Sequence, residues 1–202
     1  MLHLVKVTKA ERDTMCDNIF SSYILGAYTV LSECEDCANI FREHIPVACF
    51  TNFRDALFHF RKMAHSTEYL ELVRQTNSIK EHVNRAKTDA ITFILEYMSA
   101  IVDILFSQLP KDASSKKELK QLNAEICKTD LNYRLGGLML SSTPVMRPPD
   151  DHMLDLLDNY ISRINELVDA KVFKRSLQDY RLGQRKEDNH SEDSLGFESC
   201  QH

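Results

Sequence analysis

The stretch Phe50–Ala64 places apolar side chains at alternating steps of three and four residues. This spacing puts them on one face of an α-helix, which must be covered by another part of the chain. A second stretch, Ile79–Ile104, repeats the pattern over a longer run. Two consecutive helices of this kind bury their apolar faces by packing together. We therefore predict a fold built around this helix pair. The inward residues of the first helix are expected to be Phe50, Phe53, Leu57, Phe60 and Ala64.

Helical patterns also precede and follow this pair. Thr8 and Glu11 have the spacing of a capping box, which predicts a helix from there to about Glu43. Gly26 lies within that helix and is expected to mark a close approach of a second helix. Further helices are predicted at 46–65 and 67–109, then from Ser114 or Ser115, and again from Asp150 or Asp151.

Composition fixes the fold class. The chain has only five glycines and five prolines, too few for a sheet protein with frequent turns. We predict an all-α antiparallel bundle of about five helices, with long first and third helices, in a single domain over 1–182. Residues 183–202 are charged and show no apolar period, so a disordered polar tail is expected there.

Charge and cysteine content narrow the class of protein. The net charge of −5 gives no strongly basic surface of the kind that dedicated DNA-binding domains carry. The six cysteines lie mostly within helical patterns, which is typical of reduced thiols in a cytosol. The N-terminus lacks the pattern of a signal peptide. The longest apolar run, Ala100–Phe106, is interrupted by Asp103 and is shorter than a membrane span. A cytoplasmic protein without membrane contact is expected.

Cys34, Cys37, His44 and Cys49 raise the alternative of a zinc site. Structural zinc sites place cysteine pairs on tight turns, whereas Cys34 and Cys37 fall inside a helical pattern. Buried thiols that act as small apolar side chains are the better interpretation. No metal and no cofactor are predicted.

Arg54, Asp55 and His59 form the motif R-D-x3-H within the first helix of the central pair. Arg147–His152 and Arg185–His190 share the Arg-to-His spacing, but neither has an acid after the arginine. The motif and its helical setting resemble the HEPN superfamily of prokaryotic helical bundles. This resemblance implies a metal-independent ribonuclease or an RNA-binding subunit of a defence or toxin system.

The resemblance also implies roles for the three residues. Arg54 would stabilise charge on the scissile phosphate, His59 would transfer protons at the ribose oxygens, and Asp55 would orient one of them. Two copies of the motif would meet across a homodimer interface. The sequence adds Arg61 as a binding residue, together with a polar stripe made of His82, Arg85 and Asp89. An Arg85–Asp89 ion pair is expected within that stripe.

A second interpretation has no enzymatic activity. Arg54 and Arg61 then pair with acids or water at the surface, and His59 is an ordinary histidine at the edge of the core. On this interpretation the chain is a helical adaptor that associates with itself or binds a larger effector protein. The two alternatives differ in whether Arg54 and His59 converge in a groove at a dimer interface or point to bulk solvent.

Overall fold

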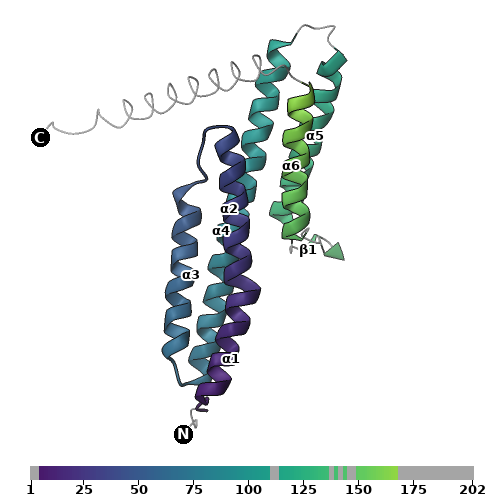
Figure 1. Ribbon diagram of the computed structural model, residues 1–202. Helices are drawn as coiled ribbons and strands as arrows, with labels where there is room; N and C mark the ends of the chain where they lie inside the picture. The colour runs from purple at the N-terminus through teal and green to yellow at the C-terminus, as the bar shows by residue number, and fades with distance from the viewer. Residues whose placement is uncertain (1–4, 110–113, 137–138, 141–142, 145–148, 168–202) are drawn as a thin grey trace, which may run out of the picture. The chain divides into compact units, whose positions relative to one another are not determined.

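The computed structural model describes residues 5–109, 114–136, 139–140, 143–144 and 149–167. Helices dominate these ranges, which confirms the all-α fold class of packed helices (Figure 1). The helices are α1 (Lys9–Ile19), the π-helical segment η1 (Phe20–Ile24), α2 (Leu25–Ile40), α3 (Val47–His65), α4 (Tyr69–Gln108), α5 (Ser114–Leu135) and α6 (Asp150–Leu167). A short antiparallel pair joins β1 (Met139–Leu140) to β2 (Thr143–Pro144). The predicted tail, 183–202, lies outside the described residues.

The chain divides into two compact units. The first contains Met1–Ile94 and Asp130–Leu157, and the second contains Leu95–Thr129 and Asp158–His202. Helices α4, α5 and α6 each begin in one unit and end in the other. The single domain expected over 1–182 stays a prediction.

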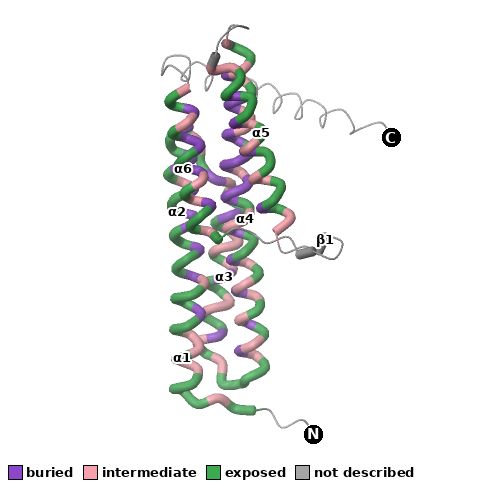
Figure 2. The backbone as a smooth tube through the Cα atoms, turned by 90° about the vertical axis from the view of Figure 1, so that its right-hand side faces the viewer, coloured by how far each residue is buried: buried purple, intermediate pink, exposed green. Residues whose placement is uncertain are grey.

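The core of the first unit is built from α1, η1, α2, α3 and the beginning of α4. Buried positions, coloured purple, recur along these helices in Figure 2. Their side chains are aliphatic and small, and Phe53 and Phe60 pack against them while staying partly exposed. The central members are Ile19, Ile24, Ala27, Ala56, Met63, Leu72, Ile79 and Val83. Each predicted apolar series therefore contributes only some of its members to this core: Phe53 and Phe60 from the first series, Ile79 and Val83 from the second.

The predicted capping box begins α1. The Glu11 amide donates to Thr8 Oγ1 (3.3 Å), and the Thr8 amide donates to Glu11 Oε2 (2.9 Å). Hydrogen bonds from the Thr8 side chain and amide lower the pKa of Glu11. Both amides would otherwise lack a partner at the helix start, so these residues fix where α1 begins.

The π-helical segment η1 joins α1 to α2 and accommodates an apolar spacing that a regular α-helix would not place on one side. Ile19 and Ile24 are five residues apart, yet both are buried. A five-residue step exceeds one α-helical turn, and the wider π turn returns Ile24 to the inward side. The interpretation of Gly26 is wrong. Gly26 is exposed, and a Cβ atom built on it would have no described atom within 4 Å. Among the described residues, therefore, no helix packs closely against Gly26.

The inward face of α3 also differs from the prediction. Its buried residues are Cys49, Ala56 and Met63, whereas Phe50 and Leu57 are 46% and 40% exposed. Small Ala56 at the centre lets the backbone of α3 approach its neighbours, and the large rings lie on the flank of the contact. The helix is thus rotated relative to the face inferred from the aromatic residues.

The second unit has its own apolar core between the end of α4, α5 and the end of α6. It buries Ile101, Leu105, Leu119, Leu122, Ile126 and Ile164. Helix α4 is long and apolar enough to meet the length and composition of a membrane span, which the sequence analysis missed. Buried core helices have the same composition, and 56% of the qualifying window is buried within the protein.

Candidate functional site on helices α2, α3 and α4

Arg54 lies on the outer side of α3 and its side chain is 74% exposed. Its Nε and Nη2 atoms both donate to Asp55 Oδ1, at 3.3 and 3.1 Å. Asp55 is therefore the direct partner of Arg54, and this ion pair stands in solvent. An exposed pair of this kind contributes at most about 1 kcal/mol to stability.

His59 lies on the side of α3 that faces α4. Its Nδ1–H donates to Gln75 Oε1 (2.6 Å), and Gln75 Nε2 donates onward to Glu71 Oε1 (2.5 Å). Gln75 is only 2% exposed, so its amide needs these partners. The His59 ring also stacks on the His82 ring, with centroids 5.3 Å apart and planes 19° apart.

His82 completes a polar cluster between the two helices. Its Nδ1–H donates to Asn52 Oδ1 (3.3 Å), so each imidazole is bonded to one amide and stacked on the other imidazole. We call Asn52, His59, Gln75 and His82 the histidine cluster. It crosses from α3 to α4 at two levels and fixes how the two helices are aligned lengthwise.

The structure separates the two ends of the predicted motif. Five residues advance about 140° around an α-helix, so Arg54 and His59 leave α3 in different directions. Arg54 contacts Asp55, whereas His59 contacts Gln75 and His82. Arg147, Arg185 and His190, which belong to the other two motif matches, lie outside the described residues.

The remaining predicted binding residues are dispersed. Arg61 is exposed on α3, and Asp89 is exposed on α4. Arg85 forms an ion pair with Glu81, one helical turn earlier. The prediction that Arg85 pairs with Asp89 is therefore wrong. Of the predicted stripe, only His82 meets a residue of the motif, namely His59.

The cysteines of the zinc alternative behave as apolar side chains. Cys34, Cys37 and Cys49 are buried. Burial raises the pKa of Cys34, and burial together with the charge of Asp89 raises the pKa of Cys49 to about 11. Both thiols are therefore protonated at neutral pH, which makes them poor ligands and poor nucleophiles. Among the residues that the structure describes, no group of three or more His, Cys, Asp or Glu side chains is placed to hold a metal ion.

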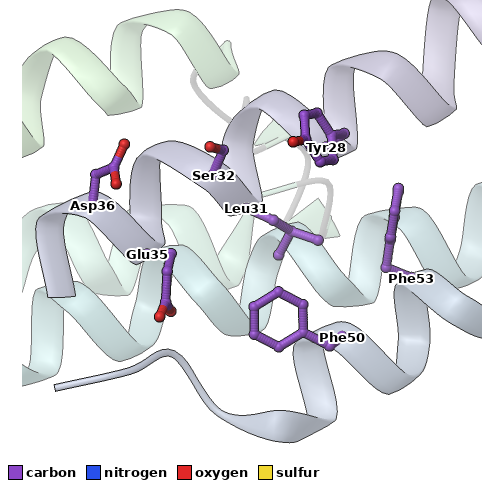
Figure 3. Close-up of a pocket in the computed structure, with 7 residues that line it drawn as sticks. All are labelled: Tyr28, Leu31, Ser32, Glu35, Asp36, Phe50 and Phe53. Atoms are coloured by element: carbon purple, nitrogen blue, oxygen red, sulfur yellow. The ribbon is translucent and has the colours of Figure 1, made fainter. Parts of the chain in front are cut away.

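An apolar groove runs between α2 and α3, and the sequence analysis did not identify it. Its volume is about 320 Å³. Figure 3 shows the Phe50 ring and the Leu31 side chain turned toward each other across it, with acidic side chains at one end. We call this feature the α2–α3 groove, lined by Tyr28, Leu31, Ser32, Glu35, Asp36, Phe50 and Phe53. The aromatic spacing of α3 is the sequence signal for this groove, but the same spacing predicts a core face, so the sequence alone does not distinguish the two.

The acidic end of the groove is held by the turn that follows α2. Glu35 contacts the His44 ring and accepts a hydrogen bond from the Ile45 amide (3.0 Å). Burial raises the pKa of Glu35, but the hydrogen bonds from His44 and Ile45 outweigh it, so the net effect is a lowered pKa. The carboxylate thus stays charged while it fixes the connection to α3.

Comparison of the chain with protein-family models, with curated proteins and with solved structures found no match.

Proposed function

We propose that the chain is a helical interaction protein that works by binding other protein chains through the outer surface of α2 and α3. The exposure of large apolar side chains on these helices carries the proposal. Tyr28, Phe50 and Phe58 are 60%, 46% and 54% exposed, and the first two line the α2–α3 groove. Contiguous apolar surface of this kind is typical of a protein interface.

The arrangement of the predicted catalytic residues supports the same proposal. The Nδ1 atom of His59 is hydrogen-bonded to Gln75, inside a cluster that links α3 to α4. Arg54 forms an ion pair with its neighbour Asp55. This pair lies on a different side of α3 from His59. Within one protomer these residues act as structural and surface groups.

The proposal includes the antiparallel packing of α3 and α4. As residue numbers rise along α3, the numbers of their partners fall along α4. Asn52 pairs with His82, and His59 pairs with Gln75. Antiparallel packing at these two levels holds α3 so that Phe50 and Leu57 face outward.

Photo-crosslinking inside cells tests the interaction surface. A photoreactive phenylalanine at Leu57 is expected to form a defined crosslinked product whose second chain is identified by mass spectrometry. The matched control is Leu131, an exposed leucine on α5 that is 55% exposed against 40% for Leu57. Equal or absent crosslinking at the two positions would contradict the proposal.

A second candidate function is the metal-independent cleavage of RNA in a prokaryotic defence or toxin system. The observation in its favour is the stacked pair of partly exposed imidazoles, His59 on α3 and His82 on α4. Helix α3 also carries Arg54 and Arg61. Imidazoles titrate near neutral pH, as general acid–base catalysis requires. The arginines would have to reach the imidazoles of a second protomer.

Cleavage of a mixed RNA substrate in EDTA tests this candidate. Cleavage by the 2′-hydroxyl leaves 2′,3′-cyclic phosphate ends. His59→Ala is expected to abolish it, and Arg54→Ala to slow it by about 10²–10³-fold through lost charge stabilisation. His152→Ala, an exposed histidine on α6, is the control. If the unmodified protein leaves the RNA intact, the ribonuclease function is excluded and the protein-binding function remains.

A further inference from the structure

Apolar side chains extend along α2 and α3 beyond the groove, beside the exposed Arg54–Asp55 ion pair. Tyr28 meets Phe53 (ring centroids 6.5 Å apart), and Phe20 meets Phe60 (5.9 Å). Leu57 lies between these two ring pairs along α3. These residues form an apolar strip that runs from Phe50 to Phe60. The α2–α3 groove is the part of this strip near Phe50. A strip of this length fits a second helix laid along it, as in helix-in-groove recognition.

Charges of opposite sign stand at the two ends of this strip. Asp36 is exposed at the end near Phe50, where it lines the groove. Arg61 is exposed at the other end, directly after Phe60. Phe50 and Arg61 are eleven residues apart on α3, which is about 16 Å along the helix axis. Within the described part of the chain, neither Asp36 nor Arg61 has an ion-pair partner.

We propose that the occupant of this surface is a second copy of the chain, related by a two-fold axis perpendicular to α3. Helix α3 then lies against its partner in the antiparallel direction, and Asp36 of each protomer faces Arg61 of the other. The proposal rests on the proposed interaction function and names its partner. The charge pattern is the argument, because this surface carries both halves of a self-complementary pair.

Other arrangements lack this complementarity. A two-fold axis parallel to α3 would place Asp36 against Asp36 and Arg61 against Arg61, which is repulsive. An anionic lipid surface would meet the carboxylates of Glu35 and Asp36 in the groove. A partner with charge of one sign would attract one of the two residues, Asp36 or Arg61, and repel the other.

Charge reversal with mixing tests the register directly. Sedimentation velocity gives the dimer dissociation constant of each purified variant. Asp36→Arg and Arg61→Glu are each expected to weaken dimerisation by about tenfold or more, because each creates two like-charge contacts. An equimolar mixture of the two single variants is expected to form a heterodimer with near-original affinity, because both contacts again join opposite charges. The double variant Asp36→Arg/Arg61→Glu is expected to recover as a homodimer.

Matched controls and folding checks keep the outcomes distinct. Asp155→Arg on α6 and Lys117→Glu on α5 reverse exposed charges elsewhere and are expected to leave the dissociation constant unchanged. Circular dichroism confirms that each variant is folded. A monomer at high concentration, or a dimer insensitive to Asp36 and Arg61, overturns the proposal. If Leu57 crosslinks to a different protein, the interaction function survives while self-association fails.

Discussion

Met63 and Leu57 lie on the same helix but in opposite environments. Met63 is fully buried in the core of the first unit and accepts a weak hydrogen bond from Thr76 at its sulfur (3.6 Å). Leu57 is 40% exposed on the apolar strip. The apolar series predicted from the sequence includes Leu57 and leaves Met63 out, because it follows the large aromatic side chains. Burial here follows the small residue Ala56, which allows close approach.

Met63→Ala is therefore expected to lower the free energy of unfolding by about 2–5 kcal/mol, through lost transfer energy and a residual cavity. Leu57→Ala is expected to lower it by about 1 kcal/mol or less. Urea denaturation of both variants measures the difference. Equal losses of unfolding free energy in the two variants would mean that Leu57 is buried, as the sequence predicts.

Gly26→Ala is expected to stabilise the protein. The glycine is exposed within α2, and the added methyl meets open space. Alanine restricts the unfolded chain, which favours the helix by about 0.5–1 kcal/mol. The thermal midpoint should rise by a few degrees, about 2–4 °C per kcal/mol for a chain of this size. Ala124→Gly, at an exposed position within α5, is the matched control and should lower the midpoint. A lower midpoint for Gly26→Ala would mean that η1 needs the freedom of glycine.

At the scale of elements, the turn between α2 and α3 closes around a single carboxylate. Arg42 takes a left-handed conformation (φ 57°). The Glu43 amide then donates to Ala38 O (3.0 Å), and the Arg42 amide to Asn39 O (2.9 Å). These two bonds end α2 in a Schellman motif. Glu35 holds the following residues through His44 and the Ile45 amide. Apolar periodicity predicts the end of this helix near Glu43, a few residues after its end at Ile40. It does not predict the Glu35 contacts, because these join positions nine and ten residues apart.

Glu35→Gln is expected to destabilise the protein at pH 7 by about 1–2 kcal/mol, through weakened charge-assisted hydrogen bonds. The pKa of Glu35 in the folded protein is below its ordinary value of 4.5, so the folded state binds this proton less readily than the unfolded chain. The stabilisation is therefore present above pH 4.5 and is lost as the pH falls through the folded-state pKa. Urea denaturation at pH 7 and pH 3.5 should show the difference shrinking, whereas the exposed neighbour Glu33→Gln should show little effect at either pH. A difference that is independent of pH would contradict the role of the charge.

At the scale of the whole molecule, apolar periodicity predicted which segments are helical but not how the side chains meet. The all-α class follows because the period of three to four residues runs through most of the chain. The histidine cluster could not be predicted, because Asn52 and His82 are thirty residues apart and meet only after α3 and α4 pack. The rotation of α3 and the π turn at η1 depend on packing for the same reason. Of the predicted site residues on α3 and α4, the structure brings His59 and His82 into contact, and nothing in the sequence predicts that contact.

The two compact units are expected to unfold together. Helices α4, α5 and α6 pass without interruption from one unit into the other, and helix formation is cooperative along the chain. The chain has no tryptophan, so one introduced residue is a unique reporter. Phe53→Trp reports on the first unit and Phe106→Trp on the second. Urea transitions followed by fluorescence should coincide with each other and with the loss of helical circular dichroism. Ile126→Ala, which removes a buried side chain of the second unit, should shift both reporters equally. Two separate midpoints, or a shift confined to Phe106→Trp, would show that the units are independent domains and that the single domain predicted over 1–182 is wrong.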